Sequence, residues 1–248
     1  MRSEQLIQAI SACATEENAF LALKKGLPIG QTDGGEIVVS QKRERTLTTR
    51  HTCVTGAGKS ECIRRMLVTL SCLYEKDEAC FLIFSPYREY GELLSFSAMD
   101  ITLPYVRGKE DLKSIVTTLK ELRAMREMGG NGYPHLFVVL DGVDELPDCN
   151  KNGELEELRD VIELLSHRED MDVICGVELY KSIFSGYPGA FVGIGNCLIT
   201  AEQDGKADVT YVQDDVSLSL PITVEFPTEP SLSQTAALLN SIAKRDKT

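Results

Sequence analysis

The sequence is poor in residues that define several classes of protein. Its 248 residues include no tryptophan and three histidines, and 26 basic against 38 acidic side chains give a formal charge of −12. That balance excludes a protein that coats nucleic acid through a general excess of positive charge. No run approaches the roughly eighteen apolar residues of a membrane-spanning helix, and the N-terminus lacks the continuous apolar core of a signal peptide. We therefore expect a cytoplasmic protein with no membrane segment of its own.

The eight cysteines do not form a metal or redox motif. None of them has a partner at the Cys-x-x-Cys spacing, and the three histidines complete no zinc pattern. Most cysteines lie within apolar stretches such as residues 79–84 and 172–176, where a free thiol packs as a small hydrophobic group. The cysteine pattern therefore predicts buried thiols and a reducing compartment.

What is present is the composition of a globular domain. A hydrophobic fraction of 43% with 26% charged residues can build a sizeable core at this length. Apolar residues at helical spacing predict one or two amphipathic helices within residues 1–26. The sequence shows no internal repeat or low-complexity linker after them, so we expect a single domain over residues 27–248.

Strands and helices alternate along most of that domain. A Gly-Gly turn within residues 27–40 predicts a β-hairpin. Short apolar runs predict strands at 51–54, 80–84, 136–140 and 172–176. Apolar residues at helical spacing predict helices at 61–73, 112–125 and 155–165. This alternation predicts an α/β fold, in which a mostly parallel sheet has helices on both faces.

The regular pattern weakens beyond residue 176. A glycine-rich stretch comes first, and strand-like runs follow at residues 209–212 and 222–226. Residues 231–247 predict a terminal helix that is capped by a serine. The regular alternation of strands and helices therefore ends near residue 176.

The segment CVTGAGKS, from Cys53 to Ser60, has the position of a phosphate-binding loop because it joins a predicted strand to a predicted helix. Its glycines remove side chains from backbone that must wrap a polyphosphate. The lysine then meets the β- and γ-phosphates, and the serine hydroxyl binds Mg²⁺. We expect ATP and Mg²⁺ as cofactors, with the nucleotide bound by Thr55, Gly56, Ala57, Gly58, Lys59 and Ser60.

Cys53 departs from the full pattern G-x-x-x-x-G-K-[ST], whose first position is glycine. The alternative interpretation is a Gly-Lys-Ser turn that caps a helix and binds nothing. The order of strand, Gly-x-Gly-Lys-Ser and amphipathic helix is much rarer than the tripeptide alone. It therefore favours nucleotide binding.

Three carboxylates follow the apolar run at residues 136–140. They are Asp141, Asp144 and Glu145, and burying such a strand end is costly unless a cation or water meets the charges. We assign Asp141 to Mg²⁺ coordination and Glu145 to polarising the attacking water, with Asp144 as the other candidate for that role. The alternative is an acidic helix N-terminus that only complements the helix dipole.

With both motifs placed, residues 27–176 resemble the FtsK/SpoIIIE family of P-loop motor ATPases. LPIGQTDGGEIVV is similar to the hairpin before the family's phosphate loop, and TCVTGAGKSECIRRMLVTL is similar to the loop and its helix. FLIFSPYREYGELLSF resembles the strand that reads Ile-Asp-Pro-Lys in the family. The resemblance implies a RecA/FtsK-like P-loop ATPase domain, an oligomeric ring that is hexameric in the family, and translocation of DNA or protein.

Several family features are altered in this sequence. Gly142 stands where these motors have a catalytic glutamate directly after the aspartate, which moves that role to Glu145. Ser85 and Tyr87 replace the family's aspartate and lysine after the second strand. The polar sensor stretch expected at residues 176–179 is missing, and no arginine finger can be carried over. These losses resemble the degenerate ATPase modules of type VII secretion.

The sequence also supports alternatives to a motor. One is a nucleotide-binding module that does not hydrolyse ATP and regulates assembly. DGVDEL, at residues 141–146, is similar to the acidic motif of NACHT-type signalling ATPases, which makes a nucleotide switch the second interpretation. A scaffold with a vestigial phosphate loop is the third, supported by Cys53 and opposed by the intact Lys59 and Ser60.

Overall fold

The computed structural model describes residues 27–34, 37–40, 51–74, 77–95, 100–104, 106–129, 132–146, 154–178, 197–213, 217–218 and 222–225. The helices predicted at residues 1–26 and 231–247 lie outside these ranges. The division of the chain at residue 26 therefore stays a prediction.

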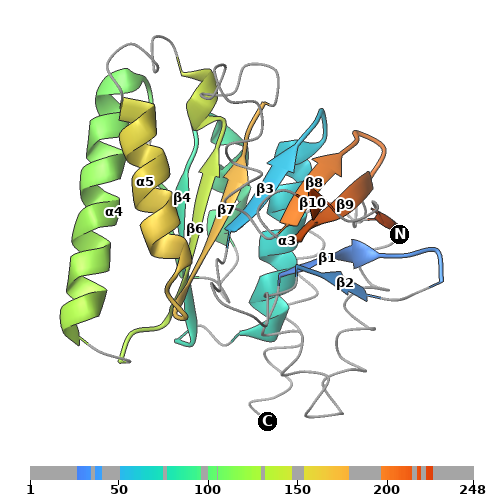
Figure 1. Cartoon of the computed structure of the whole chain (residues 1–248), viewed down its shortest axis with the longest axis horizontal. Helices are drawn as coiled ribbons and strands as arrows, with labels where there is room; N and C mark the ends of the chain where they lie inside the picture. The colour runs from blue at the N-terminus through green and yellow to red at the C-terminus, as the bar shows by residue number, and fades with distance from the viewer. Residues whose placement is uncertain are drawn as a thin grey trace.

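All described strands belong to one sheet (Figure 1). They are β1 (Pro28–Gln31), β2 (Ile37–Val39), β3 (His51–Thr55), β4 (Ala79–Phe84), β5 (Asp100–Thr102), β6 (His135–Asp141), β7 (Met171–Gly176), β8 (Cys197–Ala201), β9 (Lys206–Gln213), β10 (Ser217–Leu218) and β11 (Ile222–Glu225). Their order is β2-β1-β11-β9-β8-β3-β7-β6-β4-β5, and β10 pairs with β9. Strands β8 to β5 in this order are parallel, whereas β9, β11, β1 and β2 extend the sheet in antiparallel pairs.

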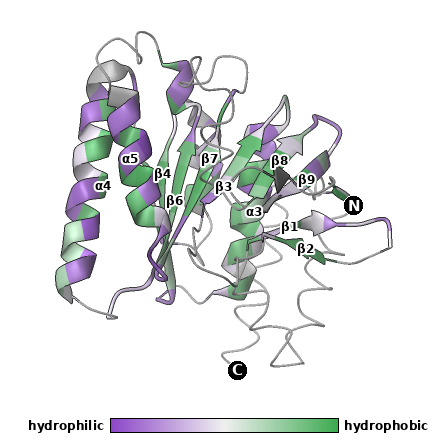
Figure 2. Ribbon diagram, in the orientation of Figure 1, coloured by the Kyte–Doolittle hydropathy of each residue, from purple (hydrophilic) through white to green (hydrophobic). Residues whose placement is uncertain are grey.

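Helices cover both faces of the parallel part. α3 (Lys59–Leu73) packs on one face, and α4 (Lys109–Gly129) and α5 (Glu154–Ser166) lie side by side on the other (Figure 1). Two short 3-10 helices, η1 (Arg88–Ser95) and η2 (Val143–Glu145), follow β4 and β6. The central strands are largely hydrophobic in Figure 2 because both of their faces are covered.

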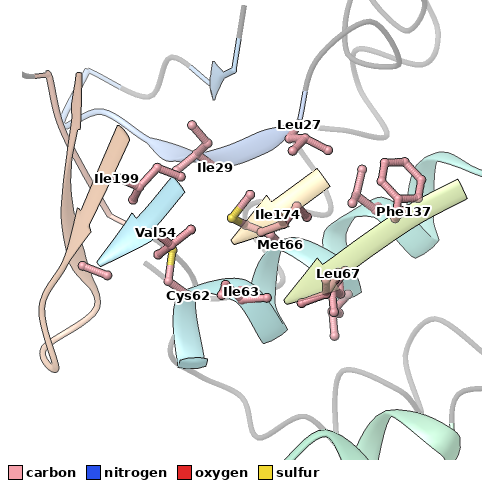
Figure 3. Close-up of a cluster of buried hydrophobic side chains, with 14 of the residues drawn as sticks. Leu27, Ile29, Val54, Cys62, Ile63, Met66, Leu67, Phe137, Ile174 and Ile199 are labelled. Carbon is pink, nitrogen blue, oxygen red and sulfur yellow. The ribbon is translucent and has the colours of Figure 1, made fainter. Parts of the chain in front are cut away.

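The core on the α3 side joins the helix to five strands. Figure 3 shows the α3 side chains Cys62, Ile63, Met66 and Leu67 against Ile29, Val54, Phe137, Ile174 and Ile199. Each of these residues is almost fully buried, and a buried aliphatic side chain contributes roughly 1.5–3 kcal/mol. This packing fixes the first turn of α3 against the ends of β3 and β6, where the candidate site lies.

The structure confirms the predicted α/β fold and the hairpin at residues 27–40, which is the antiparallel pair β1–β2. It also adds strands that the sequence did not predict. β8 pairs in parallel with β3, although it follows a glycine-rich stretch, and β5 is a strand of only three residues at the sheet edge. The parallel part of the sheet therefore continues beyond residue 176. No helix in the described ranges has the length and apolar character needed to cross a membrane.

Candidate functional site

The segment between β3 and α3 is a tight glycine-containing loop. Gly56 has a φ of +93°, which a residue with a side chain rarely adopts. A Cβ at Gly56 would lie 2.3 Å from the Ala201 carbonyl oxygen, and one at Gly58 would lie 2.1 Å from the Glu202 carbonyl oxygen. The Gly58 N–H donates to the Ala201 carbonyl at 3.1 Å. The end of β8 therefore supports the loop and leaves room only for glycine.

Cys53 lies within β3 rather than in the loop. It is 1% exposed and is in register with Cys175 of β7 and Leu198 of β8. Burial raises the pKa of the Cys53 thiol to about 12, with a smaller contribution from the charge of Asp144. The thiol is thus a neutral group of the core. Cys53 replaces the first glycine of the phosphate-loop pattern at a position that lies in a strand, where its side chain packs in the core.

Two side chains at the start of α3 reach the acidic end of β6. The Lys59 ammonium donates to Glu145 Oε1 at 2.7 Å, and the Ser60 hydroxyl donates to Asp141 Oδ2 at 2.6 Å. Burial opposes the charge of Lys59, but the hydrogen bond and the negative charge of Glu145 outweigh it and raise the lysine pKa. The fold therefore brings together the two segments that the sequence analysis singled out, although they lie about eighty residues apart in the chain.

Asp141 is a buried carboxylate with one engaged oxygen. Its Oδ2 accepts from Ser60 and, at 2.9 Å, from the Tyr90 hydroxyl, while its buried Oδ1 accepts no hydrogen bond from any described residue. Burial raises the pKa of Asp141, although both hydroxyl donors favour its charged form. A nearby cation with its bound water would stabilise the charged form of this carboxylate.

The residues fit a magnesium ion of the kind that accompanies a nucleotide. The described part of the chain contains no group of three His, Cys, Asp or Glu side chains that could hold a metal. Mg²⁺ at a phosphate loop needs no such group, because phosphate oxygens and water supply most of its ligands. Ser60 and Asp141 are the side chains that would hold it.

The structure separates the two candidates for activating water. η2 turns so that Glu145 faces Lys59, whereas Asp144 Oδ2 accepts the Glu178 N–H at 2.9 Å, just beyond β7. Burial raises the pKa of Asp144 to about 6, although backbone hydrogen bonds favour its charged form. Asp144 therefore holds the segment after β7, and Glu145 is the carboxylate directed at the loop.

Two tyrosines complete the site, and neither was a predicted site residue. The Tyr87 hydroxyl donates to Glu145 Oε2 at 2.5 Å, and Tyr90, which is fully buried, donates to Asp141. Both follow β4, which pairs in parallel with β6. The sequence could have indicated them, because two tyrosines directly follow the strand that neighbours the acidic strand. It did not show that their hydroxyls point toward the carboxylates.

No family model and no curated protein matches the sequence. Solved structures do match. The chain aligns with the cytoplasmic domain of the type VII secretion ATPase EccC of Thermomonospora curvata at a TM-score of 0.60 and 15% identity, covering 89% of this chain and 31% of that one. It also aligns with ATPases 2 and 3 of EssC from Geobacillus thermodenitrificans, at a TM-score of 0.58 and 14% identity. That alignment covers 89% of this chain and 50% of the EssC structure.

A third match is the pCW3 conjugation coupling protein TcpA, in a structure with ATPγS. Its TM-score is 0.55 at 15% identity, and the alignment covers 90% of this chain and 70% of TcpA. The fold is that of an FtsK/SpoIIIE-type P-loop ATPase. The resemblance predicted from the motifs is thus confirmed for the fold. The chain spans about a third of the EccC structure and half of the EssC structure.

Proposed function

We propose that this chain binds ATP and Mg²⁺ and hydrolyses the β–γ bond of ATP as a motor, or a subunit of a motor, that moves a DNA or protein polymer within an oligomeric ring. The observation that carries the proposal is the pairing of the loop with the acidic strand end. Lys59 contacts Glu145, and Ser60 contacts Asp141. A P-loop ATPase needs these four side chains within reach of one phosphate group.

The proposed mechanism assigns a task to each of these groups. Backbone N–H groups of the loop and the N-terminus of α3 receive the phosphates. Lys59 leaves Glu145 for the β- and γ-phosphates, and Glu145 then accepts a hydrogen bond from the attacking water and orients it. Ser60 and Asp141 would hold Mg²⁺, which would neutralise charge on the phosphates.

Neither polymer is singled out by the described residues. Arg64 and Arg65, one of the local basic clusters in the sequence, both pair with Glu61 at 2.6 Å, and Arg65 is 5% exposed. Arginines engaged in this way are poor candidates for contacts with a DNA backbone. The other basic cluster, at residues 42–50, lies outside the described ranges. DNA and protein both stay open as substrates.

The decisive experiment measures Mg²⁺-ATP binding by calorimetry and phosphate release on the same sample over a series of protein concentrations. We expect saturable binding, together with turnover per chain that rises with concentration because sites in a ring are shared between subunits. Absence of binding would reject the proposal entirely. Titration of the Lys59→Ala variant distinguishes binding in the loop from binding elsewhere.

A second candidate is a nucleotide-binding module that regulates assembly without hydrolysis, including a NACHT-like switch. Gly142 favours it, because this residue stands where related motors carry the catalytic glutamate. Tight Mg²⁺-ATP binding with no phosphate release at any protein concentration would support this module over a motor.

A further inference from the structure

We propose that Tyr87 is a positioning residue that holds Glu145 for hydrolysis, and that glycine at position 142 is what makes room for its ring. The inference rests on the proposed ATPase function. It explains two departures from the motor pattern, at positions 87 and 142, as one structural change.

The first step is the contact with the carboxylate. Tyr87 lies just after β4, where its backbone N–H donates to the Ser85 hydroxyl at 3.1 Å and fixes the turn. Its phenol reaches across to η2 and donates to Glu145 Oε2 at 2.5 Å. Burial and the negative charge of Glu145 raise the pKa of Tyr87, so the phenol keeps its proton and acts as a donor at neutral pH.

The second step is the space that the ring fills. Gly142 has a φ of +69°, directly precedes η2, and donates its N–H to the Gly176 carbonyl at 3.0 Å. A Cβ at Gly142 would lie 2.5 Å from Tyr87 Cε2 and 3.0 Å from Tyr87 Cζ. The ring therefore lies against bare backbone, where the side chain of a glutamate would otherwise stand.

The third step is the division of the carboxylate between two donors. Lys59 contacts Oε1 of Glu145 and Tyr87 contacts Oε2. When a bound nucleotide draws Lys59 to its phosphates, Tyr87 still holds Oε2 and fixes the plane of the carboxylate. Oε1 can then accept a hydrogen bond from the attacking water. Nucleotide binding in the loop is thereby coupled to the availability of Glu145 as the base.

The test compares two tyrosine-to-phenylalanine variants. Tyr87→Phe keeps the ring over Gly142 and removes only the hydroxyl, so kcat should fall about tenfold or more while the Kd for Mg²⁺-ATP changes less than about threefold. Tyr133→Phe makes the same chemical change at a partly exposed tyrosine between α4 and β6, and it should change neither. An unchanged kcat in Tyr87→Phe overturns the inference.

A double mutant tests whether Tyr87 acts through Glu145. If it does, Glu145→Gln and Tyr87→Phe/Glu145→Gln should have the same residual rate, because residues that act as a unit are not additive. A multiplicative loss would overturn the assignment. If the wild type binds ATP without turnover, the proposed function fails and the positioning role fails with it. Turnover that is insensitive to Tyr87→Phe rejects the positioning role alone.

The steric part has a readout that needs no turnover. Gly142→Ala should lower the melting temperature, and combining it with Tyr87→Ala should lower it by less than the sum of the two single losses, because the smaller side chain removes the clash. Additive losses would reject the claim that the ring requires glycine at position 142.

Discussion

Under the proposed function, the Glu145 carboxylate and the phosphates of ATP compete for the Lys59 ammonium. In the structure its ammonium contacts Glu145, and its side chain is 15% exposed. Lys59→Ala should weaken Mg²⁺-ATP binding at least tenfold, which is about 1.4 kcal/mol or more, because a charge-assisted contact with phosphate is lost. Calorimetry measures the affinity, and circular dichroism checks the fold.

Lys120→Ala is the matched control for this variant. Lys120 lies on α4, is 53% exposed and pairs with Glu157, so its loss should leave nucleotide affinity unchanged. If Lys59→Ala binds as tightly as the wild type, the loop is not the nucleotide site.

Glu145 and Asp144 are adjacent carboxylates with different surroundings. Glu145→Gln should retain Mg²⁺-ATP binding and lower phosphate release about a hundredfold, since general base assistance is worth roughly that much. Asp144→Asn should retain turnover, because Asp144 accepts the Glu178 N–H rather than facing the loop, and an amide oxygen can still accept that N–H. Phosphate release and urea unfolding of both variants decide between them. Loss of turnover in Asp144→Asn alone would return the catalytic role to that residue.

Gly58 shows how closely the end of β8 approaches the loop. Gly58→Ala would place a Cβ 2.1 Å from the Glu202 carbonyl oxygen, so the loop or β8 must shift. We expect a loss of stability of about 1–3 kcal/mol, as for other overpacked sites, together with weaker nucleotide binding. In Gly108→Ala the new methyl group meets open space, and its unfolding free energy should stay within about 0.5 kcal/mol of the wild type. Equal effects of the two substitutions in chemical denaturation would contradict this account.

At the scale of elements, β3 carries a buried histidine at its first position. His51 is fully buried, and desolvation lowers its pKa from 6.5 to about 4. His51 is therefore protonated below about pH 6.5 in the unfolded chain, but only below about pH 4 in the folded chain. Stability should fall by about 3 kcal/mol as the pH decreases through that window.

Urea unfolding of the wild type and His51→Phe between pH 7 and 4 measures this contribution. Asp144 acts in the opposite direction, because its folded-state pKa is raised from 3.8 to about 6, but it is present in both chains. The difference between the two curves therefore isolates His51. Parallel curves would show that the imidazole is not responsible for the acid sensitivity.

The elements that the sequence predicted are those with a local signal. α3, α4, α5 and strands β3, β4, β6 and β7 each carry a long periodic or apolar run, and the loop and the acidic strand end follow from them. β8 has a weaker signal, because its five residues follow a glycine-rich stretch and one of its two partners, β3, lies more than a hundred residues earlier in the chain. Tyr87 and Tyr90 were overlooked for a similar reason: their hydroxyls meet carboxylates more than fifty residues later in the chain.

At the scale of the whole molecule, several arginines of the described part are engaged within the chain. Arg126 and Arg168 both bind Asp170, and Arg64 binds Glu61. If a cation assists hydrolysis from a neighbouring subunit, turnover per chain should rise steeply with protein concentration and then saturate. Phosphate release read alongside the sedimentation profile tests this expectation. Turnover per chain that is constant from monomer to oligomer would place the whole active site in one chain.

The contact between Tyr87 and Gly142 also couples two positions in evolution. While the ring is present, the first side-chain atom of a glutamate at position 142 would lie 2.5 Å from Tyr87 Cε2. The φ of +69° at position 142 strains any side chain there, whatever the space. A lineage that gains a glutamate at position 142 must therefore move or lose the ring and also change the backbone after β6, so positions 87 and 142 should change together in homologous sequences.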